Sequence, residues 1–187
     1  RAYRYQFLET AIAWLELGPS ETLLVEIAED FDIQSDEGNT KLTQVTHSST
    51  DRRLTLASKK TREALTNFWS ASGEGADPSI SLVLLTNMPA GKEARCEFPD
   101  DKTGIDYWVQ VQAGADPVPL WDALKSVLEP GLLRDWLETE ASQSEFLAKL
   151  VSRIEWRMAQ EAGPERTAML TALLTSRLSA LGLPTGF

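Results

Sequence analysis

The sequence predicts an α/β fold, a small mixed sheet flanked by helices, with a helical C-terminal part. Three observations predict it. Apolar residues recur at helical spacing near the start of the chain, short β-rich segments follow, and apolar residues return to helical spacing beyond residue 119. The resulting order of helix, strand, hairpin, helix and strand is typical of a sheet with helices packed against it.

The elements of the N-terminal part follow in order. A helix is predicted at residues 3–17, because Gly18 and Pro19 end the apolar pattern. A strand is expected at 22–27, then a hairpin with strands at 31–33 and 40–46. A helix that begins after the cap residue Ser58 continues through Trp69. The apolar run at 79–86 predicts a buried strand.

The C-terminal part combines a segment without a clear pattern with several predicted helices. Residues 87–104 are rich in Gly and Pro and predict no regular element. Apolar stripes at 120–128, 132–137, 146–158 and 169–178 predict helices. We therefore expect a core at 1–118 and a helical extension at 119–187 that leads to further domains. The last two stripes exceed what one small sheet needs, so we expect packing against a following domain or a second copy.

Charge is distributed unevenly. The net charge of −10 argues against a general nucleic-acid binder. Residues 41–62, however, hold six basic side chains and one acidic one. Two interpretations stay open with equal weight: contact with DNA phosphates, or a solvated helix face formed by the last three of these residues. The candidate DNA-binding residues are Arg52, Arg53, Lys59, Lys60 and Arg62.

Rare residue types narrow the function classes. Cys96 is the only cysteine and cannot form an internal disulfide, which favours a reducing, cytoplasmic setting. No apolar run approaches the ~20 residues that cross a bilayer, so no membrane contact is expected. His47 is the only histidine, which leaves little material for a catalytic triad or a zinc site. The chain starts at Arg1 without Met, and we expect it to be an excerpt of a longer polypeptide.

Two short strings carry the functional signal: Glu29-Asp30-Phe31-Asp32-Ile33 and Leu42-Thr43-Gln44-Val45-Thr46-His47-Ser48. Side chains alternate along a strand with period two, so Gln44 and Thr46 point the same way. The turn at 35–39 folds them back toward Asp32.

With the opening Arg1-Ala2-Tyr3-Arg4-Tyr5-Gln6-Phe7, these strings resemble the Cap4-type double-stranded DNA endonuclease domain, also known as domain of unknown function 4297. That family belongs to the PD-(D/E)xK nuclease superfamily and serves as the N-terminal effector of bacterial anti-phage defence proteins. The resemblance implies a restriction-endonuclease-like fold, cleavage of double-stranded DNA, and either homo-oligomers or a partner NTPase or sensor module.

The resemblance also implies a site. Mg²⁺, with Mn²⁺ as the alternative ion, would be held by two acidic or amide side chains and a backbone carbonyl. Asp32 matches the first ligand, with Asp30 as the alternate. Gln44 matches the second ligand and the Val45 carbonyl the third. Gln6 matches a polar position on the first helix that approaches the site.

One position departs from the family pattern. Thr46 stands where the catalytic lysine is expected, and losing one such stabilising group typically costs ~10²–10³ in rate. Lys41 would lie on the opposite face of its strand, whereas Lys59 or Lys60 could reach in from the next helix. Two hypotheses follow: a Mg²⁺-dependent endonuclease impaired by Thr46, or an inactive pseudonuclease that binds DNA or builds an oligomer. Glu26 is a further acid within reach.

Overall fold

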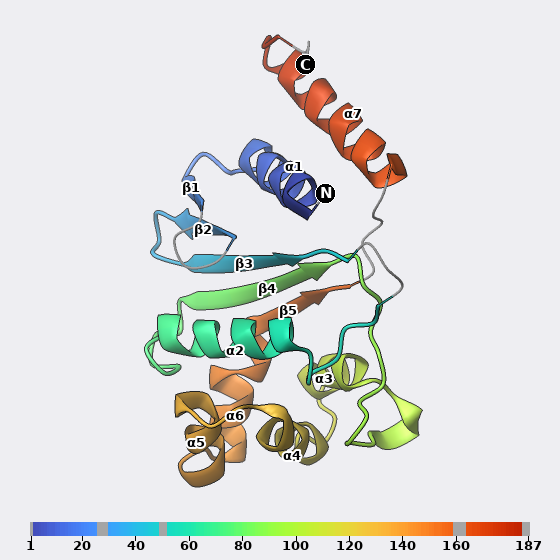
Figure 1. Ribbon diagram of the computed structural model, residues 1–187. Coiled ribbons are helices and arrows are strands. Elements are labelled where there is room, and N and C mark those ends of the chain that lie inside the picture. The colour runs from blue at the N-terminus through green and yellow to red at the C-terminus, as the bar shows by residue number, and fades with distance from the viewer. Residues whose placement is uncertain (1, 26–29, 49–51, 159–163, 185–187) are drawn as a thin grey trace.

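The computed structural model describes residues 2–25, 30–48, 52–158 and 164–184. A five-stranded sheet lies between two layers of helices (Figure 1), which confirms the predicted mixed α/β class. The strands are β1 (Glu21–Val25), β2 (Phe31–Ser35), β3 (Thr40–Thr46), β4 (Ile80–Thr86) and β5 (Ile154–Arg157). The helices are α1 (Ala2–Leu15), α2 (Lys59–Ala71), α3 (Gly104–Gln112), α4 (Val118–Val127), α5 (Leu132–Thr139), α6 (Gln143–Lys149) and α7 (Pro164–Ala180), with 3-10 turns at Pro99–Asp101 and Val151–Arg153.

The sheet follows chain order, β1-β2-β3-β4-β5. β1, β2 and β3 are antiparallel, and β2 and β3 form the predicted hairpin around Gly38, whose φ of 86° favours glycine. β3, β4 and β5 are parallel, so α2 crosses over between β3 and β4. β3 and β4 end on the side of the sheet where α2 begins (Figure 1).

One face of the sheet carries most of the core. Leu42 of β3, Leu82 and Leu84 of β4 and Ile154 of β5 point to this face, because residues two apart on a strand share a side. The helices α2 to α6 cover them. The largest fully buried side chains of the cluster include Leu65, Phe68, Trp69, Trp108, Leu120, Leu124, Phe146 and Leu150.

The other face is covered by α1. Tyr5 packs there on Val83 and Leu85, with Val45 beside them, and α7 lies against α1 (Figure 1). The outer side of α1 carries Phe7 and Trp14, which are 70% and 55% exposed. The second layer of helices is therefore thin, and part of its apolar surface faces outward.

One prediction about the C-terminal part is wrong. Residues 154–157 were expected to continue a helical stripe, but they form β5, where Ile154 and Trp156 face the core and Glu155 and Arg157 face the other way. The free edge of β4 supplies the hydrogen-bond partners that a local pattern cannot reveal. The large core cluster has residues on both sides of the expected boundary at 118, and that boundary stays a prediction. The end of the first expected strand, with Glu26 and Ile27, lies outside the described residues.

The connection between β4 and α4 contains an element that the sequence did not predict. α3 begins after Thr103, whose side chain accepts a hydrogen bond from the backbone N–H of Asp106 as an N-cap. Trp108 of α3 is fully buried, and its indole N–H donates to the carbonyl of Val151. α3 thus ties the middle of the chain to the segment that leads into β5.

Candidate functional site

Three of the candidate site residues, Gln6, Gln44 and Val45, form hydrogen bonds with the carboxylate of Asp30. The side-chain amide of Gln6 donates to its Oδ1 at 2.8 Å. The amide of Gln44 and the backbone N–H of Val45 both donate to its Oδ2 at 2.5 Å. Three N–H groups from α1 and β3 therefore hold one carboxylate that lies just before β2. Hydrogen bonds to an ionised group are stronger than neutral ones, so this contact fixes the position of α1 against the hairpin.

The register of the hairpin explains why Asp30 takes this place. Asp32 lies opposite Leu42 and Phe31 opposite Thr43, so the next step along the ladder sets residue 30 against Gln44. The sequence favoured Asp32 as the first ligand. The structure instead brings Asp30 to Gln44, and it places Asp32 inside β2 with only 2% of its surface exposed.

Three N–H groups point at the Asp30 carboxylate, so a hard divalent cation would fit here only if oxygen atoms of Gln44 and Val45 were turned toward it. A strand residue directs its N–H and C=O to the same neighbouring strand, so the Val45 carbonyl faces the Asp30 side as its N–H does. The oxygen of Gln44 replaces its nitrogen after a half-turn of the amide plane. One carboxylate with neutral oxygens is a donor set that Mg²⁺ accepts when substrate phosphates complete its shell. Among the described residues, no cluster of three or more His, Cys, Asp or Glu side chains forms a metal site.

Thr46 takes up the position of the expected lysine. It pairs with Thr86 of β4 in the parallel ladder, and it shares the face of Gln44. Lys41 lies on the opposite face, as predicted, where it lines a hollow under α1. Lys59 is ion-paired with Glu63 and 80% exposed, and Lys60 is also exposed. Neither side chain is held at Thr46, so the structure does not supply the charge that either was expected to bring.

A contact that the sequence did not reveal closes the far end of β3. The side chain of Asn87 accepts a hydrogen bond from the N–H of Ser48 at 2.8 Å and donates one to the carbonyl of Ser48 at 2.7 Å. The amide thus extends the ladder between β3 and β4 beyond Thr46. An asparagine directly after the apolar run of β4 is the only local signal for it. His47 lies beside Tyr5, with ring centroids 5.3 Å apart.

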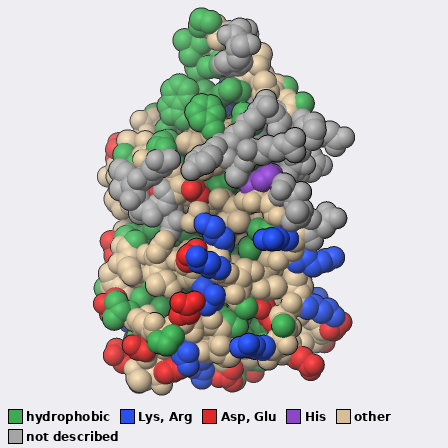
Figure 2. All heavy atoms as spheres, in the orientation of Figure 1, with side chains coloured by type: hydrophobic (Ala, Val, Ile, Leu, Met, Phe, Trp, Pro, Cys, Tyr) green, Lys and Arg blue, Asp and Glu red, His purple; other side chains and the backbone are tan. Residues whose placement is uncertain are grey.

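The basic residues that follow β3 differ in their surroundings. Arg52 and Arg53 are exposed, and the guanidinium of Arg53 donates to the carbonyl of Ala90. Figure 2 shows Lys and Arg side chains on the face over α2, with acidic side chains among and below them. Lys59 and Lys60 conform to a solvated helix face, whereas Arg62 is largely covered and paired with Glu129. DNA contact by these residues stays a prediction.

Comparisons with known proteins add no further constraint: the chain matches no protein-family model, no curated protein and no solved structure. Within the part of the chain that the structure describes, none of the helices is both long and apolar enough to cross a bilayer.

Proposed function

We propose that the chain is a Cap4-type, restriction-endonuclease-like nuclease domain that acts on double-stranded DNA with Mg²⁺ or Mn²⁺, and in which Thr46 weakens cleavage. The observation that carries the proposal is the convergence of Gln6, Gln44 and Val45 on Asp30. These four residues come from the segments that resemble the family, far apart in sequence. The proposal includes the family's setting, an effector in an anti-phage protein with a partner module or homo-oligomer.

The residues have distinct roles in this proposal. Asp30, Gln44 and the Val45 carbonyl would hold the metal ion, and Gln6 would orient the Asp30 carboxylate from α1. The metal supplies an activated water and neutralises charge on the phosphate. Thr46 offers a hydroxyl at the position where a cation is needed, and a hydroxyl cannot stabilise the added negative charge of the transition state equally well.

The second candidate function is a pseudonuclease that binds DNA or builds an oligomer without turnover. The observation that favours it is also specific. Thr46 is uncharged, and the two lysines of α2 that could replace the missing group are exposed, one of them paired with Glu63. A fold that keeps the metal-holding residues and lacks the cation would retain binding before it retained catalysis.

The first experiment compares two acids of the same hairpin. In a plasmid-cleavage assay on the full protein with Mg²⁺ or Mn²⁺, Asp30→Asn should remove all metal-dependent cleavage. Asp32→Asn is the matched control, and it should reduce cleavage only as far as it reduces the folded fraction measured by circular dichroism. Cleavage that survives Asp30→Asn and disappears in a folded Asp32→Asn would return the ligand role to Asp32 and contradict the proposed site.

The second experiment restores the missing charge. Thr46→Lys should raise the cleavage rate at least ~10-fold, because an ammonium group then faces the Gln44 side of β3. Thr46→Ser is the control, since it keeps a hydroxyl and should leave the rate within a factor of a few. If neither the parent nor Thr46→Lys cuts while both retain DNA in a filter-binding assay, the pseudonuclease is the better account.

A further inference from the structure

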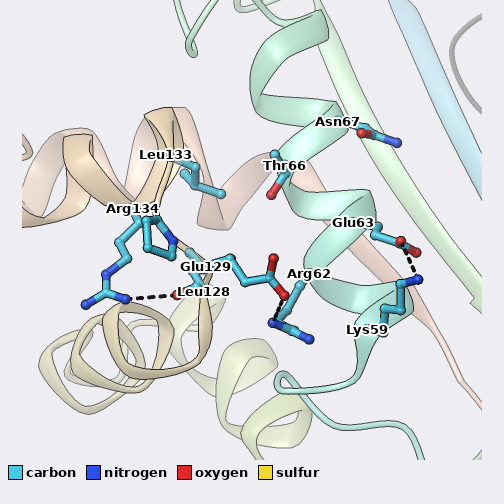
Figure 3. A pocket seen from close by; sticks show the side chains of 11 residues that line it. Lys59, Arg62, Glu63, Thr66, Asn67, Leu128, Glu129, Leu133 and Arg134 are labelled. Carbon is cyan, nitrogen blue, oxygen red and sulfur yellow. Dashed lines mark hydrogen bonds and ion pairs between the residues drawn. The ribbon is translucent and has the colours of Figure 1, made fainter.

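A hollow of about 250 Å³ lies between α2 and the connection from α4 to α5 (Figure 3), and its lining shares no residue with the Asp30 contact. Three cations line it: Lys59 and Arg62 from α2 and Arg134 from α5. Two carboxylates, Glu63 and Glu129, accompany them. The wall therefore keeps a positive excess in a protein whose net charge is −10.

Arg62 is the central side chain of this hollow. Arg62 also lines a second hollow, of about 320 Å³. Its Nε is buried and has no hydrogen-bond partner among the described residues. Thr61, Trp69 and Trp156 also bury a polar atom without a partner there, but none of them lines either hollow. Because Nε is enclosed, an external ligand can reach this guanidinium only through its Nη groups, one of which Glu129 now occupies.

Glu129 occupies the accessible side of the same guanidinium. Its Oε1 lies 2.5 Å from Nη1 of Arg62, yet the Glu129 side chain is 77% exposed. An exposed carboxylate on a flexible side chain contributes little to stability. A ligand with more acceptor oxygens could therefore displace it at small cost. Arg134, by contrast, is committed to Glu138 and to the carbonyl of Leu128, so it shapes the wall (Figure 3).

Other donors face the same space. Thr66 and Asn67 extend the polar side of α2 along the hollow, and both are exposed. Gly131 precedes α5 with a φ of 154°, a conformation that favours glycine, and no side chain caps the first turn of α5. The partial positive charge of that turn adds to the charge of Arg62.

We propose that this hollow binds a phosphate group, with Arg62 as its principal ligand and Glu129 as the carboxylate that the phosphate displaces. A guanidinium matches a phosphate through two parallel hydrogen bonds, and its two Nη groups form such a pair once Glu129 has moved away. The phosphate belongs either to a DNA backbone or to a free phosphate-bearing molecule such as a nucleotide. Only the DNA alternative rests on the proposed nuclease function.

The direct test is titration of the full protein with inorganic phosphate, with binding measured by isothermal titration calorimetry. Arg62→Gln should weaken phosphate binding at least about tenfold, the usual cost of losing a hydrogen bond to a charged group. Arg177→Gln makes the same chemical change on α7, where the side chain is exposed, and should leave the affinity unchanged. Asp30→Asn should also leave it unchanged, which separates this site from the metal site.

A second variant keeps the test decisive if Arg62→Gln does not fold. Glu129→Gln removes the competing charge at an exposed position, so phosphate should bind severalfold more tightly. Unchanged affinity in Glu129→Gln, or undiminished affinity in a folded Arg62→Gln, would overturn the proposal. A severalfold loss of affinity for a short DNA duplex in Arg62→Gln would assign the phosphate to the DNA backbone. Unchanged duplex affinity, with weaker binding of a nucleoside diphosphate, would assign it to a free ligand.

Discussion

The two faces of the sheet use side chains from the same strands, yet they are buried in different ways. Under α2 to α6, Leu82 and Leu84 join a large cluster of leucines and aromatic rings that the helices close off. Under α1, Val83 and Leu85 form a small cluster with Tyr5 and Val45, beside a hollow whose lining includes Lys41 and Arg157. The first face encloses most of the apolar core, whereas the second leaves the charged side chains of Lys41 and Arg157 beside a hollow.

The largest expected difference between the two faces comes from replacing leucines of β4 that point to opposite faces. Leu82→Ala should destabilise the protein by about 3–5 kcal/mol, because it opens a cavity in a fully enclosed core. Leu85→Ala, on the other face, should cost about 2–3 kcal/mol, because water can fill space beside the hollow under α1. Urea unfolding followed by tryptophan fluorescence measures both. Equal losses would show that the α1 layer is as well packed as the other.

A second pair compares two arginines near β5. Arg153 donates to the carbonyls of Gly75, Asp77 and Ile80 and lies over the ring of Phe68. Arg153→Met should cost about 2–3 kcal/mol, since it leaves carbonyl groups without a donor.

The matched change on the α1 side is Arg157→Met. Arg157 pairs with the nearby Glu155, and both side chains are about half exposed, so the loss should stay below about 1 kcal/mol. Thermal unfolding of both variants gives the comparison. A larger loss at Arg157 than at Arg153 would reverse the roles assigned to the two faces.

A third prediction concerns how the stability of the protein depends on pH through Glu145 of α6, a helix on the well-packed face. Hydrogen bonds from Ser142 and Lys149 lower the pKa of Glu145 to about 2, below its ordinary value of 4.5. A lowered pKa stabilises the folded state above pH 4.5, and that contribution is lost as the pH falls through the folded value. Glu145→Gln should therefore lower the melting temperature at pH 7, and the difference from the parent should vanish near pH 2. A difference independent of pH would exclude the charge of this capping box as its cause.

The smallest effect on stability is expected at the outer side of α1. Phe7→Ser and Trp14→Ser should change the free energy of unfolding by no more than about 0.5 kcal/mol, because both side chains are largely exposed. The variants have a second readout, because α1 lies against α7, which carries the stripe at 169–178 for which packing against a following domain or a second copy was expected. If copies associate through α1 and α7, the double variant should shift the protein toward the monomer in light scattering. A monomeric parent would contradict association through this face.

The two apolar stripes that were expected to pack against a following domain or a second copy differ in their burial. Phe146, Leu150 and Ile154, from the stripe at 146–158, are buried in the core of the chain itself. The stripe at 169–178 belongs to α7, where Met169 is 46% exposed and Leu174 is only half-buried. A periodic apolar stripe predicts that a face will be covered, but it does not say by what.

Local signals were sufficient for several elements. The bounds of β3, the hairpin before it, the helix α2 after Ser58 and the buried run of β4 agree with the expected segments to within a residue or two. Each depends on neighbours in sequence: alternation, turn residues or helical spacing. The site residues Gln44 and Gln6 were also chosen from the sequence, through a family resemblance that stays untested.

The tertiary structure decided what depends on partners distant in sequence. Residues 154–157 satisfy a helical pattern, but the parallel edge of β4 makes them a strand. Asp30 and Asp32 are equivalent by alternation, and only the register of β2 on β3 brings Asp30 to Gln44. In the sequence, Arg62 is one of several basic residues on a predicted helix, and only the structure shows that it pairs with Glu129. Periodicity is a property of a segment, whereas register, burial and charge pairing are properties of two segments in contact, and the sequence alone does not state which two will meet.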